Sequence, residues 1–245
     1  LQSLEYQGFN ATRLADEGFF GGPLVMHGML TAFRTNALRE IGGFKEKHLI
    51  EDYEVTARLK ERGWHVKSAV NAKAWTLVPE TLTSLWRQRT RWSYGGMMVV
   101  ASMNKFVPVI QDVIGHGVFI ATILMINALL FLSGDGVPHA LANWIVGIAL
   151  VHLGIWYGFQ MWLMRLYREK DAFDWLIRGT LILEFVYSNV MTLVLIGSYL
   201  FFGFNLLARS ASDTSNRVVQ SIISAGRRLF LDFGYTEGWG TRAGS

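Results

Sequence analysis

The fold is decided around the stretch WRQRTRWSYGG, residues 86–96, which places three arginines and two tryptophans in its first seven positions. On a helix, Gln88, Arg91 and Trp92 are spaced i, i+3 and i+4, so they share one face. An amide, a guanidinium and an aromatic ring on one face can hold a sugar by stacking and hydrogen bonding while the cation meets a phosphate. The same composition is typical of the basic and aromatic belt at a membrane surface, so both interpretations stay open at this point.

A long apolar region follows this stretch. Only 17% of the residues are charged, which is below the roughly 25% usual for soluble domains. The three longest apolar segments are about Val113–Leu132, Leu141–Met164 and Thr180–Phe204. Each reaches the roughly 20 residues that cross a bilayer, so residues 111–208 are predicted to form about three transmembrane helices.

The charges between these segments predict their orientation, because cytoplasmic loops are enriched in Lys and Arg. The loop SGDGVPHALAN, residues 133–143, has neither. The loop after the second segment carries Arg165, Arg168, Lys170 and Arg178. That second loop, and with it the part of the chain before the first span, is therefore expected in the cytoplasm. The tail, residues 209–245, contains the amphipathic stretch RVVQSIISAGRRLF, which suits a helix lying flat on a membrane, and its side stays open.

Two polar residues, Glu184 and Asn189, fall inside the third apolar segment. A carboxylate within a membrane span is costly and usually faces a bundle interior or a watery path. The two residues are therefore candidates for the lining of a polar channel. The alternative is that Glu184 stands close enough to the helix end to reach the interface.

The residues before the spans have the pattern of a mixed α/β domain. Apolar, β-branched and aromatic residues over Leu24–Arg34 and partial alternation over residues 64–78 predict two strands. Between them, TNALREIGGF (35–44) and EDYEVTARLKERGW (51–64) predict helices that end at glycines. A further helix is expected to open with Pro79 in its first turn. The predicted fold class is thus α/β, followed by an all-α transmembrane region.

The pair Glu51–Asp52 stands at the start of the second predicted helix. Acidic residues at this place commonly just complement the helix dipole, but a carboxylate that faces a cleft can accept a proton as a general base. Other chemistries are excluded by composition. The chain has no cysteine for thiolate catalysis or zinc-thiolate sites, and its net charge of +4 is not gathered into one nucleic-acid-binding patch.

Three stretches together resemble a known family: GMLTAFRTNALREIGGF (28–44), IEDYEVTARLKERGW (50–64) and VPETLTSLWRQRTRWSYGG (78–96). They are similar to the second half of a family 2 (GT-A) glycosyltransferase domain from membrane-embedded processive synthases, and most resemble bacterial poly-β-1,6-N-acetylglucosamine synthases. Those enzymes carry an ED motif, then a Q-x-x-R-W motif, then membrane helices, and all three features occur here in that order. The resemblance covers about residues 1–110 well and covers the spans by architecture alone.

The resemblance implies catalytic roles for three residues. Asp52, with Glu51 beside it, would be the base that deprotonates the acceptor hydroxyl. Arg91 would neutralise the donor diphosphate, which needs a cation as the leaving group departs. The sequence departs from the family pattern at Ile50, where many relatives have Thr, and at the turn Gly42–Phe44.

The resemblance also implies residues that bind the substrates. Gln88 and Trp92 would hold the terminal sugar of the growing chain near the membrane entrance. His27 and Gly28 occupy the place where the family lines the acceptor site, and a small residue there allows close approach. For His27, a satisfied histidine at a strand end is an equally weighted alternative.

The function implied is that of an inverting, processive β-glycosyltransferase that polymerises sugar from a UDP-sugar, here UDP-GlcNAc, and passes the polysaccharide through the membrane. It would be a multi-pass protein of the inner (plasma) membrane with a cytoplasmic catalytic domain. Its partners would be the UDP-sugar donor, the growing polysaccharide, membrane lipid and an accessory membrane subunit, and no nucleic acid.

Mg²⁺ or Mn²⁺ would be held by a D-x-D motif, which this chain lacks and which is expected, with the nucleotide-binding half, before Leu1. Asp16 and Glu17 do not have that spacing and are interpreted as a solvated helix end, so no metal ligand is assigned. Two other hypotheses stay open. One is a non-processive transferase that adds a sugar to a lipid carrier, and the other is a non-catalytic membrane scaffold or channel subunit.

Overall fold

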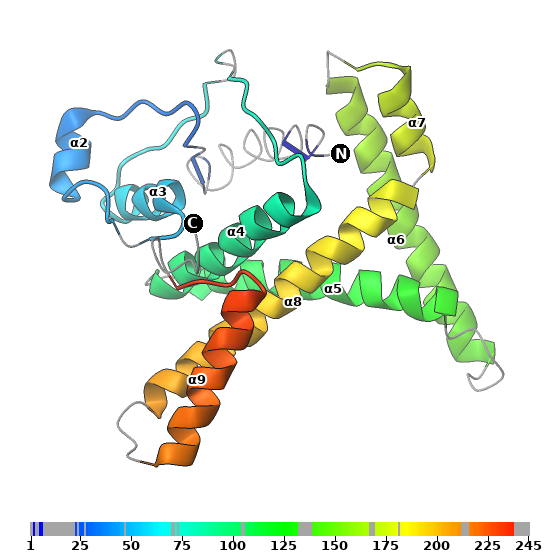
Figure 1. Cartoon of the computed structure of the whole chain (residues 1–245). Coiled ribbons are helices and arrows are strands. Elements are labelled where there is room, and N and C mark those ends of the chain that lie inside the picture. The colour runs from blue at the N-terminus through cyan, green and yellow to red at the C-terminus, as the bar shows by residue number, and fades with distance from the viewer. Residues whose placement is uncertain are drawn as a thin grey trace. The chain divides into compact units, whose positions relative to one another are not determined.

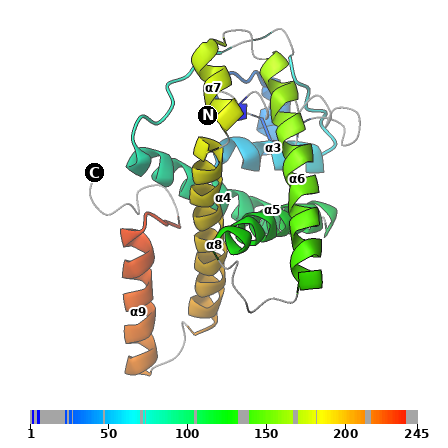
Figure 2. The same cartoon turned by 90° about the vertical axis from the view of Figure 1, so that its right-hand side faces the viewer.

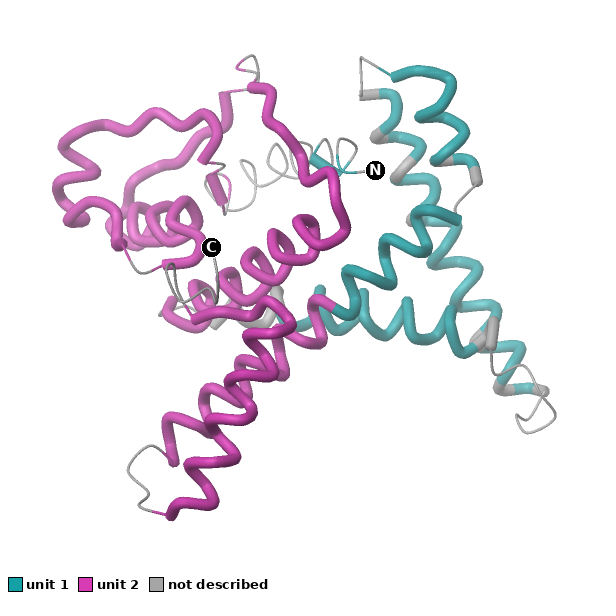
Figure 3. The backbone as a smooth tube through the Cα atoms, viewed as in Figure 1, with its two compact units in different colours: residues 1–12, 110–193 teal, residues 13–109, 194–245 magenta. Residues whose placement is uncertain are grey.

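The computed structural model describes most of the 245 residues of the chain. The described residues are 2, 5–6, 23, 25–26, 28–46, 48–69, 72, 74–103, 106–131, 139–166, 170–180, 182–211 and 216–237. The chain divides into two compact units, which Figure 3 draws in two colours. Unit 1 comprises residues 1–12 and 110–193, and unit 2 comprises residues 13–109 and 194–245.

Helices joined by turns and extended segments make up the described residues (Figure 1). The helices are α2 (Thr35–Glu40), α3 (Glu51–Glu61), α4 (Leu82–Ser102), α5 (Phe106–Phe131), α6 (His139–Leu166), α7 (Ala172–Thr180), α8 (Ile182–Ser210) and α9 (Arg217–Asp232). The helices predicted over residues 35–44 and 51–64 are confirmed as α2 and α3, and the helix predicted from Pro79 is confirmed, with a later start, as α4.

The ends of α3 and α4 follow from local chemistry. Gly63 closes α3 with a φ of 82°, a left-handed conformation that favours glycine. The prediction that Pro79 lies in the first turn of α4 is wrong, because Thr81 caps the helix instead. Its Oγ1 accepts from the Ser84 N–H at 3.1 Å, while Ser84 Oγ accepts from the Thr81 N–H at 3.2 Å, which makes a capping box.

The two predicted strands do not form in the described part of the chain. Over Leu24–Arg34 and residues 64–78, the described residues are turned or extended but pair in no ladder. A strand is stable only when a neighbour satisfies its backbone N–H and C=O groups, and neither segment lies in a ladder with another described segment. The predicted α/β class is therefore corrected to a helical one for the described residues.

Unit 1 holds most of the apolar helical sequence. Two stretches are long and apolar enough to cross a membrane, Ala142–Phe159 within α6 and Ile182–Ser210, which is α8. The apolar stretch of α5 is shorter, Val113–Ala128. The sequence predicts about three spans, and in the described residues two helices are long and apolar enough to cross a membrane.

Polar groups connect two of these helices inside unit 1. Asn127 of α5 donates from Nδ2 to Oδ1 of Asn189 on α8 at 2.8 Å, and an interhelical amide pair of this kind stabilises helix association in apolar surroundings. Glu184, one turn into α8, is only 7% exposed. Asn189 therefore faces another helix, and Glu184 is buried within the protein rather than extended to the surface.

The core of unit 2 is aromatic and includes the C-terminal tail. Tyr94 of α4, Phe201 of α8 and Tyr235 of the tail are buried together with Leu49. α9 runs beside the C-terminal part of α8 in both Figure 1 and Figure 2, and the ring of Phe230 of α9 packs against that of Phe201 at a tilt of 44° with centroids 4.9 Å apart. The predicted amphipathic stretch is thus a helix whose aromatic end packs inside unit 2.

Tyr235 fixes the tail to α8. Its hydroxyl donates to the Val194 carbonyl at 2.9 Å and fills the place where a side chain at Gly197 would begin. Burial raises the pKa of Tyr235 to about 12, so it stays a neutral donor. On the other side, Trp86 of α4 donates from Nε1 to the carbonyl of Phe233 at 2.7 Å. The tail therefore joins α8 to α4.

Replacing Gly197 by Ala is expected to destabilise unit 2 by about 1–3 kcal/mol, because the added methyl group overlaps the Tyr235 hydroxyl. Thermal unfolding in detergent, followed by tryptophan fluorescence, measures this. Gly203→Ala on the same helix is the matched control, since nothing lies within 4 Å of its added methyl group. Equal unfolding temperatures for the two variants would contradict the packing of the tail.

Candidate active site

The first turn of α3 presents Asp52 to a short loop. Asp52 Oδ2 accepts from the Gly28 N–H at 3.0 Å, and Oδ1 accepts from the Tyr53 N–H at 2.8 Å. The first N–H groups of a helix have no intrahelical partner and carry partial positive charge, so a carboxylate is favoured there. Glu51, the preceding residue, is exposed. The loop and the helix start thus hold one carboxylate, that of Asp52, in a fixed orientation.

The environment of Asp52 favours uptake of a proton. Burial raises the pKa of this carboxyl above its ordinary value, and the negative charge of Glu51 acts in the same direction. The N–H groups of Gly28 and Tyr53 and the positive charge of Arg91 oppose the rise without cancelling it. A carboxylate with a raised pKa is a better base than an exposed one.

Arg91 brings the second motif to the same place. It lies on α4, which packs against α3, and its Nη1 donates to the carbonyl of Leu49 at 3.0 Å. Its charge acts on Asp52. The two motifs, about forty positions apart in the sequence, are therefore neighbours in unit 2, as expected if both belong to one site.

Gly95 allows this approach. A methyl group added at Gly95 would lie 2.6 Å from Ile50 Cγ1, which is closer than side-chain carbons approach one another, and 3.1 Å from Leu49 Cβ, which is a tight contact. The segment that leads into α3 therefore lies directly on the backbone of α4, one turn after Arg91. Ile50 serves here as a packing residue against α4.

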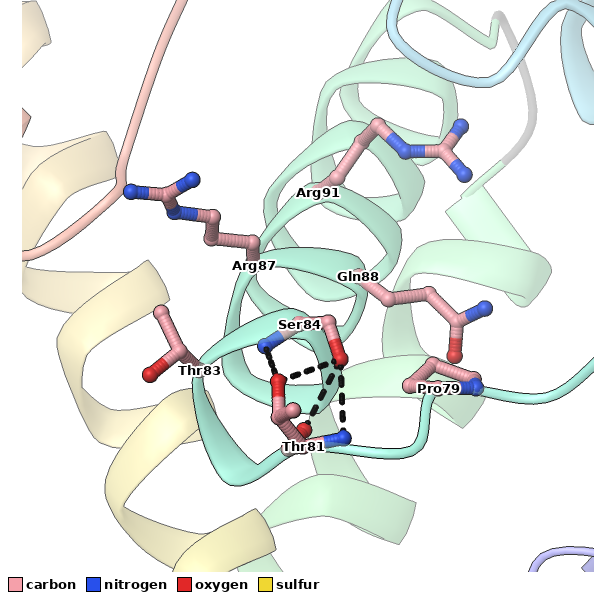
Figure 4. A pocket seen from close by; sticks show the side chains of 7 residues that line it. All are labelled: Pro79, Thr81, Thr83, Ser84, Arg87, Gln88 and Arg91. Atoms are coloured by element: carbon pink, nitrogen blue, oxygen red, sulfur yellow. Dashed lines mark hydrogen bonds between the residues drawn. The ribbon is translucent and has the colours of Figure 1, made fainter.

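A cavity of about 460 Å³ opens at the start of α4. Its lining residues are Pro79, Thr81, Thr83, Ser84, Arg87, Gln88 and Arg91, and Figure 4 shows Gln88 and Arg91 extending on the same side of the helix. The Oε1 atom of Gln88 is buried and accepts no hydrogen bond from the described residues. Hydroxyl groups, an amide acceptor and two guanidinium groups are the chemistry that binds sugars and phosphates.

Trp92 stands apart from this cavity lining. The guanidinium carbon of Arg89 lies 4.4 Å from the centroid of the Trp92 ring, a cation–π contact, and Arg89 is only 4% exposed. The structure places Asp52 against Gly28 and under the charge of Arg91. Gln88 and Arg91 line one cavity, while Trp92 packs with Arg89. His27, Asp16 and Glu17 lie outside the described residues.

Comparison with known proteins identifies the family. Residues 12–208 match the family model described as glycosyl transferase family group 2, which covers most of the chain. The chain belongs to this family. The glycosyltransferase resemblance stated from the ED and Q-x-x-R-W motifs is therefore confirmed.

Two curated relatives of this glycosyltransferase show the extent of the similarity. The poly-beta-1,6-N-acetyl-D-glucosamine synthase of Staphylococcus aureus strain COL is 33% identical over 100 residues, which is 41% of this chain and 24% of the relative. The enzyme of the same name from Staphylococcus epidermidis is 31% identical over 111 residues, 45% of this chain and 26% of the relative. The chain thus spans about a quarter of the length of these relatives. No solved structure shows a significant match.

The described part of this glycosyltransferase offers no group of three or more His, Cys, Asp or Glu side chains that could hold a metal ion. Both oxygens of Asp52 already accept N–H groups. These residues do not form a metal site by themselves, so no catalytic step is assigned to a metal here. The predicted Mg²⁺ or Mn²⁺ site at a D-x-D motif stays a prediction.

One structural device of the site was not found from the sequence. Glu54, buried on α3, accepts from Arg58 Nε at 2.6 Å and from Nη2 at 2.7 Å and pairs with Lys45 at 3.0 Å. Arg58 also donates to the carbonyls of Ile41 and, at 2.7 Å, Gly43. The turn after α2 is thereby tied to α3. The i, i+4 spacing of Glu54 and Arg58 was a visible signal for this pair.

Gly95→Ala is expected to lower catalytic efficiency by up to about 100-fold, because displacing α3 from α4 by about 1 Å misplaces Asp52 relative to Arg91. Initial rates of polymer synthesis in membranes containing the full-length protein measure the loss. Gly96→Ala is the matched control, since its added methyl group meets nothing within 4 Å. If both variants keep full activity, the contact of Gly95 with Ile50 does not position the site.

Glu54 predicts an acid dependence of stability. Burial alone raises the pKa of Glu54, but the hydrogen bonds and charges of Arg58 and Lys45 outweigh it, so the pKa lies below the ordinary value of 4.5. A carboxyl with a lowered folded pKa stabilises the fold above its unfolded pKa, and this contribution is lost as the pH falls through the folded pKa. Stability should therefore decline below about pH 4.5.

Glu54→Gln tests this assignment at neutral pH. It is expected to destabilise unit 2 by about 1–3 kcal/mol, because the partly buried Arg58 loses its anionic partner. It should also flatten the decline in acid, as followed by circular dichroism between pH 3 and 7. Glu61→Gln, at the exposed end of the same helix, is the control. A decline of equal steepness in both variants would rule out Glu54 as the acid-sensitive group.

Proposed function

We propose that the chain is the acceptor-side part of the catalytic domain and the membrane region of an inverting, processive β-glycosyltransferase. Its donor is a UDP-sugar, UDP-GlcNAc in the first instance, because the matched relatives are named as poly-N-acetylglucosamine synthases. Residues 1–110 form the catalytic part, 111–208 the membrane part and 209–245 the tail. The observation that carries the proposal is a carboxylate of raised pKa, Asp52, held within the charge field of Arg91.

In this proposal Asp52 takes the proton from the acceptor hydroxyl as that oxygen attacks the anomeric carbon of the donor sugar. The bond between the anomeric carbon and the diphosphate oxygen breaks, UDP leaves with the electron pair, and the centre inverts to a β-linkage. Glu51 raises the basicity of Asp52 by charge repulsion. Arg91 offsets the negative charge that grows on the departing diphosphate.

The cavity at the start of α4 is proposed to take the end of the growing polysaccharide. The buried Oε1 of Gln88 can accept from a sugar hydroxyl, and Trp92 is assigned a stacking role beyond its contact with Arg89. A methyl group at Gly28 would lie 3.5 Å from Asp52 Oδ2, so glycine keeps that oxygen accessible to an acceptor. His27 is proposed to line the same acceptor site.

The membrane part is proposed to pass the polymer through the inner (plasma) membrane, with the catalytic part in the cytoplasm. The two apolar stretches in α6 and α8 support a membrane location. Ser188 and Thr192 are buried on α8, one and two turns after Glu184, which gives this helix a polar side. Membrane lipid around α9, an accessory membrane subunit and a divalent metal at a D-x-D motif complete the proposal.

Asp52→Asn is expected to lower polymer synthesis from UDP-GlcNAc by about 10²- to 10⁴-fold, because the amide cannot accept the proton. Release of UDP and product length on a gel are measured in membranes containing the full-length protein. Glu61→Gln, a neutral replacement at the exposed end of α3, should leave both unchanged. Intact synthesis by Asp52→Asn would sink the proposal, and a product of a single added sugar would favour the lipid-carrier transferase instead.

A further inference from the structure

Two side chains of α3, one turn apart, hold the loop that faces the candidate base. The Gly28 N–H donates to Asp52 Oδ2 at 3.0 Å, and the Met26 N–H donates to Thr56 Oγ1 at 3.2 Å. Residues 26 and 28 are thus attached to positions i and i+4 of one helix face. The first attachment uses the carboxylate that the proposed reaction protonates, and the second does not.

The hydroxyl of Thr56 has a fixed direction. Oγ1 lies 2.6 Å from the carbonyl oxygen of Asp52, four residues earlier, and the only hydrogen on Oγ1 must point there. A lone pair of Oγ1 is then left for the Met26 N–H. Thr56 is fully buried, so water does not replace either bond. One hydroxyl therefore links the loop to the backbone of Asp52.

The two attachments respond differently to a proton on Asp52. A carboxylate accepts strongly from an N–H, whereas a protonated carboxyl accepts weakly. The bond from Gly28 therefore weakens when Asp52 takes up a proton, while the bond from Met26 to a neutral hydroxyl is unaffected. Only the Thr56 attachment keeps its strength through such a step.

We propose that Thr56 is a positioning residue that keeps the Met26–Gly28 loop in register with α3 while Asp52 changes its charge. This inference rests on the proposed role of Asp52 as the base and adds a residue that no motif comparison assigned. Thr56 does not touch the substrate in this role. It acts through the Gly28 N–H, whose direction sets how Asp52 is held.

The consequence for pH dependence has a definite sign. The Gly28 N–H lowers the pKa of Asp52, as does the charge of Arg91 on α4, whereas burial and Glu51 on the same helix raise it. Loosening the loop weakens the Gly28 bond, so the pKa of Asp52 rises. Activity needs the unprotonated carboxylate, and its acidic limb must therefore move to higher pH when the Thr56 hydroxyl is removed.

Thr56→Val is expected to lower kcat/KM about tenfold, the factor that corresponds to one net hydrogen bond, and to move the acidic limb of the pH profile to higher pH. Thr56→Ser, which keeps the hydroxyl, should restore both. Thr76→Val replaces an exposed threonine and is the matched control. Rates of UDP release from UDP-GlcNAc are measured in membranes containing the full-length protein, with thermal unfolding recorded for each variant.

Two results would overturn the inference. One is an acidic limb in Thr56→Val that coincides with that of Thr76→Val. The other is an equal shift in Thr56→Ser, which would assign the effect to side-chain packing and not to the hydroxyl. If Thr56→Val does not fold, Thr56→Ala takes its place, and an unshifted limb in that variant counts against the role. Full activity of Asp52→Asn would instead remove the proposed function itself, so the two failures are distinguishable.

Discussion

The close contact between Gly95 of α4 and the Leu49–Ile50 segment is the constraint on which the site depends. The Leu49–Ile50 segment lies directly on the α4 backbone there, and one turn earlier Arg91 donates to the Leu49 carbonyl and its charge acts on Asp52. A glycine inside a helix weakens that helix by about 1 kcal/mol relative to alanine. Gly95 carries this loss of helix stability at a position where Leu49 and Ile50 pack directly on the helix backbone.

Two carboxyl groups in the first turn of α3, those of Asp52 and Glu54, illustrate how position decides chemistry. Asp52 is partly buried beside Glu51, and burial raises its pKa by more than the N–H groups of Gly28 and Tyr53 and the charge of Arg91 lower it. Glu54 is more deeply buried but receives Arg58 and Lys45 directly, so its pKa is lowered. Their surroundings thus move the two pKa values apart, which suits Asp52 to acid–base chemistry and Glu54 to a structural ion pair. The helix α3 thereby carries both a candidate base and the ion pair that ties it to the turn after α2.

The helices of unit 2 and the shared face of Gln88 and Arg91 were predictable because their signals are local. The helices are predicted by the glycines that end them and by the spacing of their apolar residues. Gln88 and Arg91 share a face because residues three apart are neighbours on a helix. A strand depends on a pairing partner elsewhere in the chain. The composition of Leu24–Arg34 therefore predicts a strand, yet this segment forms no ladder among the described residues. Thr56 carried no signal, since a threonine inside a helix is ordinary until its hydroxyl is seen to receive the Met26 N–H.

Residues of α4 that contact the tail and residues that line the cavity lie on different faces of that helix. Trp86 and Thr90 face the tail, at the carbonyls of Phe233 and Gly234, while Gln88 and Arg91 face the cavity. Positions 86 and 88 differ by about 200° around the helix, so these are opposite sides. The side chains of a membrane belt lie at the lipid surface. Here Trp86 and Thr90 contact the tail, and Gln88 and Arg91 line the cavity proposed to bind the substrates. Because both faces belong to one helix, the contact of Trp86 with the tail and the cavity residue Arg91 lie within two turns of each other.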